Sequence, residues 1–250
     1  MAGAHALVTG GGRGIGAAVA AALREAGSRV TILGRDEPTL RAAVSAGWAD
    51  GHVVCDLTDE AQTTAAFAAA EATRGDIDML VNNAGAAASA PFHRTSAQNF
   101  RTMLDVNLMS CVHATQAALP GMIRRRRGRI VNIASTAGLK GYAYVTAYVA
   151  AKHAVVGLTR ALALETARTG VTVNAVCPGF TDTELLGRSL DEIVAKTGRT
   201  RDAARADLAA ANPQGRLVEP AEVAAAVLFL CGASAGAVNG VALTVAGGEI

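Results

Sequence analysis

The stretch Thr9-Gly10-Gly11-Gly12-Arg13-Gly14-Ile15-Gly16 follows a short apolar run and leads directly into a segment with helical periodicity. Glycines let a backbone turn sharply and approach a pyrophosphate, whose charge then faces free amides at a helix N-terminus. The G-x-x-x-G-x-G spacing differs from the common G-x-G-x-x-G dinucleotide fingerprint, but its position between strand and helix predicts a nucleotide-binding turn. The turn residues expected to contact the nucleotide are Gly10, Gly12, Arg13, Gly14, Ile15 and Gly16.

Around this turn, short apolar runs alternate with helical patterns along the whole chain. Ile15, Val19 and Leu23 fall at i, i+4 and i+8 and so share one helix face, which Gly27 is placed to end. This alternation predicts a single α/β domain over residues 1–250, a doubly wound parallel sheet with helices on both faces. The expected strands are His5–Thr9, Arg29–Leu33, His52–Cys55, Met79–Asn82, Arg129–Ala134, Val171–Val176 and Val241–Val245.

Bulk properties narrow the classes of function. Hydrophobic residues make up 51% of the 250, and the net charge of +2 is too small to indicate a nucleic-acid or anionic-membrane partner. The four cysteines lie far apart without metal-ligand spacing, which favours a reduced cytoplasmic protein with no metal. Neither a secretory leader pattern nor an apolar run of the ~18 residues that a membrane span requires is present, so we expect a soluble protein.

One strongly basic cluster, Arg124-Arg125-Arg126-Arg127, precedes the fifth expected strand. We interpret it as a solvated turn before an apolar strand. The alternative is a weak anion or partner site, because basic runs can mark nucleic-acid patches.

The end of the second expected strand, Leu33-Gly34-Arg35, bears on the choice of cofactor. An NAD site usually places a carboxylate here to accept hydrogen bonds from the ribose 2′-hydroxyl. Gly34 stands in that place, and Arg35 with Arg13 could instead grip a 2′-phosphate. Asp36 is the competing acceptor, but it lies two positions beyond the strand end and is better placed to start the next helix. We therefore expect NADPH/NADP+ rather than NADH.

Two more strand ends are candidates for the cofactor site. Asp56, with Leu57 beside it, follows the third strand and could accept a hydrogen bond from the adenine amino group. The alternative role is a helix N-cap, for which Thr58 is the better placed residue. The run Asn82-Asn83-Ala84-Gly85 closes the fourth strand with small residues and amides suited to packing against a cofactor. Its expected contacts are Asn83, Ala84 and Gly85.

Tyr148 and Lys152 lie at i and i+4 of an apolar helix and so share one face, while Ser135 ends the fifth strand. A phenol has a pKa of ~10, and a neighbouring ammonium together with the positive oxidised nicotinamide is expected to lower it towards the working range. Tyr148 would then protonate a carbonyl oxygen, which the Ser135 hydroxyl would help to hold. Taken singly, the pair could equally be a packed ring beside a solvated amine. Tyr142 and Tyr144 have no lysine four residues on.

The segment Asp182–Asn212 interrupts the alternation between the last two strands. It is charged and weakly apolar, and in this architecture such an insertion lies at the carboxyl edge of the sheet, where ligands bind. We expect a substrate lid over about residues 182–216. The alternative is a surface excursion.

Together these residues resemble the short-chain dehydrogenase/reductase family, in its single-domain branch, over essentially the whole chain. The motifs in family order are Thr9-Gly10-x-x-x-Gly14-x-Gly16, Asn82-Asn83-Ala84-Gly85, Asn107, Ser135, Tyr148-x-x-x-Lys152 and Pro178-Gly179. The resemblance implies a Rossmann-like sheet of seven parallel strands and a catalytic tetrad, Asn107, Ser135, Tyr148 and Lys152. It further implies cofactor contacts from Tyr148, Lys152, Pro178, Gly179, Thr181 and Thr183.

Within the family, residues 128–179 look most like 3-oxoacyl thioester reductases and polyketide ketoreductases. The resemblance therefore implies reduction of a 3-oxoacyl thioester or related ketone with NADPH. The alternatives are oxidation of a hydroxyacyl-CoA or cyclic secondary alcohol, and, more remotely, an NADPH-sensing protein without turnover. A sensor would be expected to lose the tyrosine or the lysine, and both are present.

The helix expected from Thr146 to Arg168 carries more apolar circumference than one sheet face covers. Val149, Val155, Val156, Leu158, Leu162 and Leu164 surround it with many alanines. We therefore expect a homo-oligomer, and the family resemblance implies a homotetramer.

Overall fold

The computed structural model describes residues 1–250 and contains one seven-stranded sheet in the order β3-β2-β1-β4-β5-β6-β7, with every pairing parallel. The predicted doubly wound α/β fold is confirmed, and each predicted strand is present with ends that differ by at most two residues. The strands are β1 (His5–Thr9), β2 (Arg29–Gly34), β3 (Gly51–Val54), β4 (Ile77–Asn82), β5 (Gly128–Ile133), β6 (Val171–Pro178) and β7 (Ala242–Val245).

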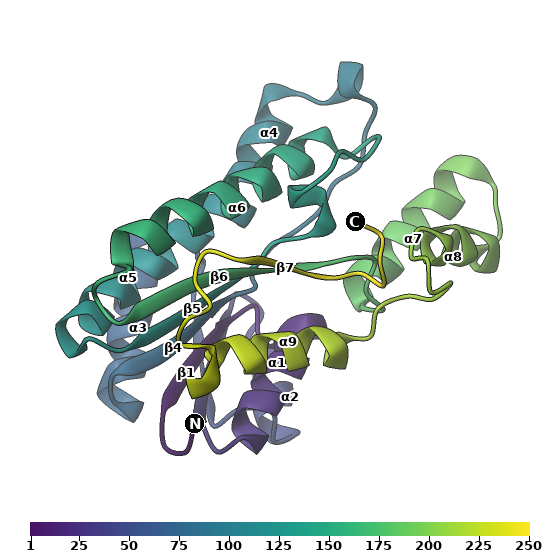
Figure 1. The fold of residues 1–250 in the computed structure, drawn as a ribbon. Helices are drawn as coiled ribbons and strands as arrows, with labels where there is room; N and C mark the ends of the chain where they lie inside the picture. The colour runs from purple at the N-terminus through teal and green to yellow at the C-terminus, as the bar shows by residue number, and fades with distance from the viewer.

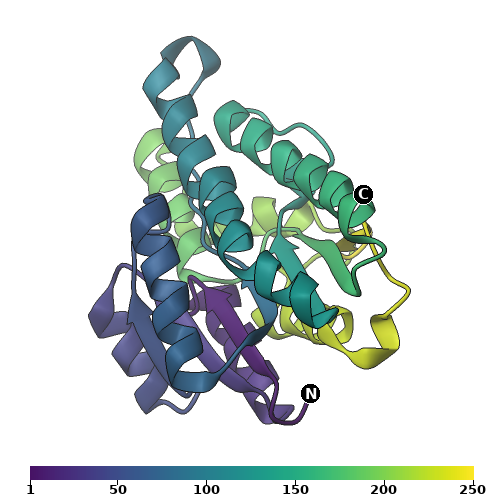
Figure 2. The same cartoon turned by 90° about the vertical axis from the view of Figure 1, so that its left-hand side faces the viewer.

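The sheet lies between two helix layers (Figures 1 and 2). One face is covered by α1 (Gly14–Glu25), α2 (Glu37–Ser45) and α9 (Pro220–Cys231), and the other by α3 (Glu60–Arg74), α5 (Ser110–Arg125) and α6 (Thr146–Thr166). None of the helices combines the length and apolarity needed to cross a bilayer. The remaining helical elements are α4 (Ala97–Leu104), α7 (Glu184–Thr197), α8 (Arg201–Ala210) and the short turns η1 (Phe92–Arg94), η2 (Asp105–Met109), η3 (Thr136–Gly138) and η4 (Ala233–Ala235).

Burial on both faces explains why the strands are continuous apolar runs. All five residues of β1 are buried, with Ala6 and Val8 in the core beneath α1 and α9 and Leu7 in the core beneath α3 and α5. Successive side chains point to opposite faces, so one strand contributes to both cores.

The strand order reverses between β1 and β4, because β2 and β3 extend one way and β5 to β7 the other. In open parallel sheets, ligands bind outside the carboxyl ends of the strands at such a switch point. The glycine-rich turn follows β1 and the Asn82–Gly85 run ends β4, so the fold places both motifs at this crevice.

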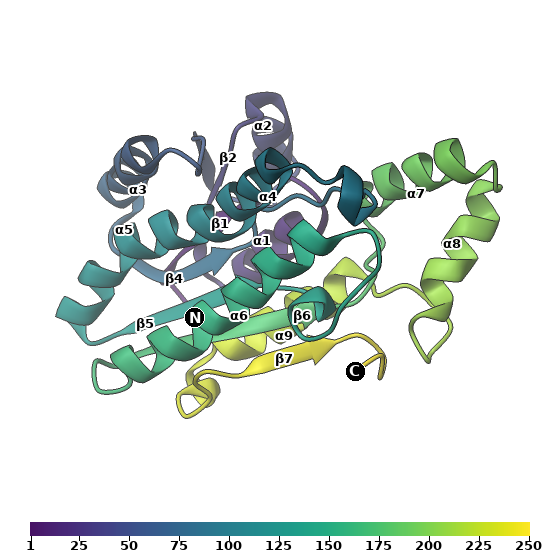
Figure 3. The same ribbon diagram turned by 90° about the horizontal axis from the view of Figure 1, so that it is seen from above.

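The insertion between β6 and β7 forms α7 and α8, which stand beyond the carboxyl ends of the strands (Figures 1 and 3). The two helices share a small apolar cluster of Leu186, Leu190, Ala204 and Leu217. Ion pairs add to it, among them Arg205 with Asp182. The insertion is therefore an ordered helical unit at the predicted edge of the sheet.

The arginine cluster at the end of α5 is more than a solvated turn. Arg125 pairs with Asp76 at 3.1 Å and donates to the Ile77 carbonyl at 2.7 Å, while Arg127 pairs with Asp78 at 2.7 Å. These contacts tie the end of α5 to the start of β4. Arg124, Arg126 and Arg127 are nevertheless exposed, as expected of a solvated turn, whereas Arg125 is half-buried.

Candidate active site

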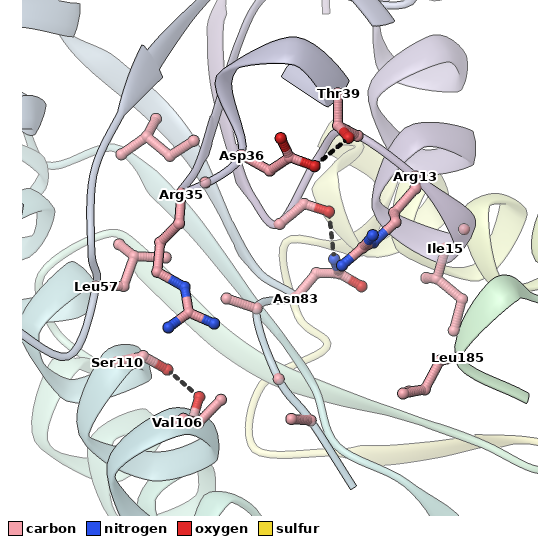
Figure 4. A pocket seen from close by; sticks show the side chains of 18 of the residues that line it. Arg13, Ile15, Arg35, Asp36, Thr39, Leu57, Asn83, Val106, Ser110 and Leu185 are labelled. Carbon is pink, nitrogen blue, oxygen red and sulfur yellow. Dashed lines mark hydrogen bonds between the residues drawn. The ribbon is translucent and has the colours of Figure 1, made fainter. Parts of the chain in front are cut away.

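A groove of about 790 Å³ lies along the carboxyl ends of β1 to β4 and is closed on one side by the start of α7. Figure 4 shows Arg13 and Arg35 reaching into it, with Asn83 between them. The predicted cofactor residues that line it are Gly10, Gly12, Arg13, Gly14, Ile15, Arg35, Asp56, Leu57, Asn83, Ala84, Gly85 and Thr183. Other residues that line the groove were not predicted from the sequence, among them Thr39, Val106, Ser110, Leu185 and Arg188.

The glycine turn has the backbone shape that a diphosphate requires. Gly10 and Gly14 have φ of 63° and 53°, a region that favours glycine. Asn83 holds the turn, because its Nδ2 donates to the carbonyls of Thr9 and Gly10 at 3.0 Å each. No side chain caps the N-terminus of α1, so its first amides are open to an anion.

Gly16 does not line the groove, contrary to the prediction. A methyl group there would collide with the Gly10 carbonyl oxygen and would come within 2.5 Å of Asn83 Nδ2. Gly16 therefore lets α1 approach the turn closely.

The two arginines are held loosely. Arg13 lies 3.7 Å from Glu184, and Arg35 lies 3.8 Å from Asp56, with the arginine side chains 48% and 69% exposed. Ion pairs this open contribute little stability, so both guanidinium groups can turn to a phosphate. The competing acceptor Asp36 stands before α2, as predicted, and its carboxylate accepts a 2.5 Å hydrogen bond from Thr39.

Asp56 lies on the groove wall, where its Oδ1 accepts from the Thr58 amide at 3.0 Å and the Thr58 hydroxyl at 2.8 Å. The amide hydrogen bond holds the pKa of Asp56 below its usual value. The N-cap of α3 is Asp59, whose side chain accepts from the Gln62 amide at 2.9 Å. The expectation that Thr58 would be the better cap was wrong, because its hydroxyl is engaged with Asp56.

Ser135, Tyr148 and Lys152 meet where η3 packs against α6. Ser135 follows β5 and its hydroxyl accepts from the Ala137 amide at 3.1 Å. A methyl group on Gly138 would come within 2.8 Å of the Lys152 carbonyl oxygen, which shows how closely η3 and α6 approach. Lys152 is 5% exposed, and its Nζ lies 5.7 Å from the centre of the Tyr148 ring.

Burial dominates the electrostatics of this pair in the chain alone. Burial raises the pKa of Tyr148, and a hydrogen bond with Ser135 acts against that rise. Burial also lowers the pKa of Lys152 to about 8. Lys152 Nζ donates to the Ile133 carbonyl at 2.8 Å. In the chain alone, burial therefore sets the direction of the Tyr148 pKa shift, and the expected lowering, which also involves the oxidised nicotinamide, stays a prediction for the complex with cofactor.

Asn107 lies in η2, a π-helical turn between α4 and α5, and is 2% exposed. Its Nδ2 donates to the carbonyls of Ala86 and Met103 at 2.9 and 3.0 Å, and its Oδ1 accepts from the Ala86 amide at 3.3 Å. A methyl group on Gly85 would lie 2.7 Å from Asn107 Oδ1 and 3.7 Å from Lys152 Nζ. Asn107 on the π turn and Lys152 on α6 therefore lie on the same side of Gly85, and π turns often occur at functional sites.

The segment after β6 links the sheet to the insertion. Thr181 donates to the Gly179 carbonyl at 3.0 Å, and Thr183 caps α7 by accepting from the Leu186 amide at 3.3 Å. A methyl group on Gly14 would lie 3.3 Å from Thr183 Cγ2, so the start of α7 faces the glycine turn. Pro178, Gly179 and Thr181 do not line the groove, whereas Thr183 does.

Comparisons with known proteins agree with this geometry. The family model described as short chain dehydrogenase matches residues 4–193. A protein of Streptomyces violaceoruber named as a ketoacyl reductase of the granaticin polyketide synthase is 41% identical over 249 residues, which cover 97% of this chain and 92% of that protein. The acetoacetyl-CoA reductase of Shinella zoogloeoides is 38% identical, with 98% and 97% of the two chains covered.

A solved structure of a variant of the actinorhodin polyketide ketoreductase with NADPH superimposes with a TM-score of 0.94. It is 38% identical, and the match covers 98% of this chain and 97% of that one. The sequence, the sheet order and the family match agree, so the chain is an oxidoreductase that belongs to the short-chain dehydrogenase family.

Proposed function

We propose that this protein is an NADP(H)-dependent reductase of 3-oxoacyl thioesters or related ketones. The observation that carries the proposal is Lys152, a buried amine one helical turn from Tyr148, with Ser135 beside the phenol. A buried ionisable pair with shifted pKa values is characteristic of acid–base sites. The names of the relatives, ketoacyl reductase and acetoacetyl-CoA reductase, support the substrate class.

The groove fits a dinucleotide, because the glycine turn leaves a cradle that side chains would fill and the amides of α1 are open. The nicotinamide cofactor supplies hydride to the carbonyl carbon when it is bound. Asp56 and Leu57, which line the groove, would contact the adenine end, and Asn83, Ala84 and Gly85 would pack against the cofactor. Thr183 is the member of the segment after β6 that is placed to contact the cofactor.

In the reductive direction, Tyr148 gives its phenolic proton to the carbonyl oxygen as negative charge develops there. The raised pKa of Tyr148 keeps the phenol protonated until that moment. Ser135 donates a hydrogen bond to the same oxygen and holds it near the phenol. Lys152 then stabilises the phenolate, and Asn107 holds the backbone at Ala86, next to Gly85.

The same residues can run the reverse reaction, in which Tyr148 accepts the proton of a secondary alcohol. Oxidation of a hydroxyacyl-CoA is therefore the second candidate.

Arg13 and Arg35 support NADPH over NADH, because guanidinium groups match phosphate oxygens and both side chains are open. We further propose that α7 and α8 form the substrate lid, since Leu185 and Arg188 reach the groove from α7. Leu164, 82% exposed on α6, supports an interface between copies in a homotetramer, whereas Val155 and Val156 are buried within the monomer. The mass in solution, measured by light scattering, tests that assembly.

An absorbance assay of NADPH and NADH oxidation with acetoacetyl-CoA, cyclic ketones and steroids tests the function. We expect turnover of acetoacetyl-CoA with NADPH, and loss of turnover with retained NADPH binding in Tyr148→Phe. Turnover confined to cyclic ketones would contradict the thioester, and a preference for NADH would contradict the roles of Arg13 and Arg35.

A further inference from the structure

The C-terminal tail, residues 246–250, folds at the carboxyl edge of the sheet just after β7, near the loop that follows α8 (Figures 1 and 3). Gly247 and Gly248 have φ of 60° and 92°, so two successive residues adopt a backbone that favours glycine. A methyl group on Gly247 would collide with the side chain of the buried Asn212 at the end of the insertion. The turn then directs Glu249 inward, where its side chain is only 2% exposed.

Glu249 is joined to the connection between Ser135 and Tyr148. Its Oε1 lies 3.1 Å from Lys140 Nζ and accepts a hydrogen bond from the Tyr142 hydroxyl. Tyr142 Oη also forms a 2.7 Å hydrogen bond with the Thr136 hydroxyl. A phenol has one proton and a carboxylate only accepts, so the Thr136 hydroxyl donates to Tyr142. The chain of bonds from Glu249 therefore ends at the residue next to Ser135.

Glu249 also contacts the segment after β6. Its Oε2 is buried without a hydrogen-bond partner and faces Gly179, where a methyl group would lie 2.9 Å away. The Tyr142 ring meets Phe180 edge to face, with centroids 6.0 Å apart. One carboxylate and one phenol thus connect the loop that follows Ser135 to the backbone at Gly179.

This arrangement is a poor device for stability alone. Burying a carboxylate with one oxygen unsatisfied costs free energy, and an apolar residue of similar volume often folds as well as a buried ion pair. Burial and the neighbouring Glu249 raise the pKa of Tyr142, so the phenol remains a neutral donor. A fixed donor and a fixed charge are suited to holding two backbone segments in one geometry.

We propose that Glu249 is a positioning residue of the active site. Through Tyr142 it fixes the loop that carries Ser135, and through Gly179 it fixes the segment after β6, so it sets the gap across which the substrate is held. The inference rests on the proposed function, because it assumes that Ser135 and Tyr148 act on a substrate oxygen.

The test compares Glu249→Ala, Glu249→Gln and Tyr142→Phe in the full chain. With acetoacetyl-CoA and NADPH, we expect Glu249→Ala to lower kcat about tenfold to a hundredfold, since small misplacements of reacting groups have effects of that size. The dissociation constant for NADPH, measured by fluorescence, should stay within about twofold. Glu249→Gln keeps an acceptor for Tyr142 and should recover most of kcat. Glu25→Ala, at an exposed glutamate at the end of α1, is the matched control.

Tyr142→Phe keeps the ring against Phe180 and removes only the hydroxyl, so it should reproduce the loss of kcat even if Glu249→Ala fails to fold. Wild-type kcat in both Glu249→Ala and Tyr142→Phe would overturn the inference. A parallel loss of NADPH affinity would also overturn it, because it would show a general scaffold role.

A second readout needs no substrate. The phenolate absorbance of Tyr148, assigned by difference from Tyr148→Phe, should titrate at higher pH in Glu249→Ala, because the displaced Ser135 no longer stabilises the phenolate. An unchanged titration would overturn the positioning role. Wild-type protein that reduces no ketone would instead contradict the proposed function, and the titration would still decide the role of Glu249.

Discussion

The two sides of the site use charge in opposite ways. On the cofactor side, Arg13 and Arg35 are 48% and 69% exposed and approach acids only to 3.7 and 3.8 Å. On the substrate side, Lys152 is 5% exposed and the Glu249 side chain is 2% exposed. Exposed charges are screened by water and salt, whereas buried charges act in a low dielectric and shift pKa values strongly.

This contrast indicates a division of labour. Open arginines can meet an arriving phosphate without first breaking strong contacts, so in the proposed function they would serve recognition of the cofactor. Buried groups cannot move without exposing unpaired charge, so they serve the geometry of the reaction. If this is right, the effect of a substitution should follow the burial of the group removed.

The largest effect is expected at Tyr148. Replacing it with phenylalanine removes the proton donor and should lower kcat about 10³-fold, within the usual range for general acid catalysis. NADPH binding should be retained, because the glycine turn and the arginines are untouched. Steady-state kinetics and fluorescence titration measure the two quantities. Tyr144→Phe, at a residue that is 66% exposed, is the matched control, and an equal loss of kcat there would contradict the role of Tyr148.

The next effect concerns pH and Lys152, whose pKa burial lowers to about 8. Below pH 8 Lys152 is protonated in both the folded and the unfolded chain. Burial of its ammonium then raises the free energy of the folded state. Between about pH 8 and the ordinary lysine value of ~10.4, only the unfolded chain binds it. The unfolding free energy should therefore rise with pH in this window, by about 3 kcal/mol.

Urea unfolding of wild type and Lys152→Met at several pH values isolates this rise, because the other titrating groups cancel in the difference. The unfolding free energy of wild type minus that of the variant should increase with pH above pH 8. Below pH 8 this difference should stay constant. A difference that does not change with pH would mean that Lys152 is solvated, and the contrast between the two sides would fail.

Arg35 should show a smaller, salt-dependent effect. Arg35→Ala removes a charge-assisted contact to the 2′-phosphate and should raise KM for NADPH about tenfold at low salt. KM for NADH should not change, and the effect on NADPH should shrink as salt rises. The control is Arg41→Ala, an equally exposed arginine that pairs with Glu37 on α2. A salt-independent effect would indicate that Arg35 is buried when the cofactor binds.

The cofactor side was predictable from sequence because its signals are local. Each predicted feature follows a strand, and the carboxyl ends of parallel strands lie at one edge of the sheet. These features are the glycine turn, Arg35, Asp56 and the Asn82–Gly85 run. The i, i+4 spacing of Tyr148 and Lys152 is equally local. Gly16 shows the limit, because spacing does not reveal whether a glycine faces the ligand or the packing beneath it.

The substrate side was less predictable because its contacts are distant in sequence and depend on burial. Glu249 meets Tyr142 across 107 residues, and no motif marks either one. The π turn around Asn107 left no periodic signal, and the resemblance to a family was needed to single that residue out. The direction of the Tyr148 pKa shift depends on desolvation, which a helical spacing does not report.

The smallest effect is expected for an exposed ion pair on the substrate side. This pair tests whether the effect of a substitution follows the burial of the charge or its location in the site. Arg205 and Asp182 form a two-pronged pair at 3.0 and 2.5 Å, with side chains 45% and 38% exposed. Exposed pairs contribute at most about 1 kcal/mol, so a double-mutant cycle with Arg205→Ala and Asp182→Asn should give a small coupling that falls with salt. Because this pair ties α8 to the start of the insertion, the variants should be cut faster by protease within residues 184–212 even though overall unfolding hardly changes. A coupling above about 2 kcal/mol would exceed what exposed pairs supply. It would show that the coupling free energy of a charge pair in this protein depends on its position beside the substrate and not on its burial.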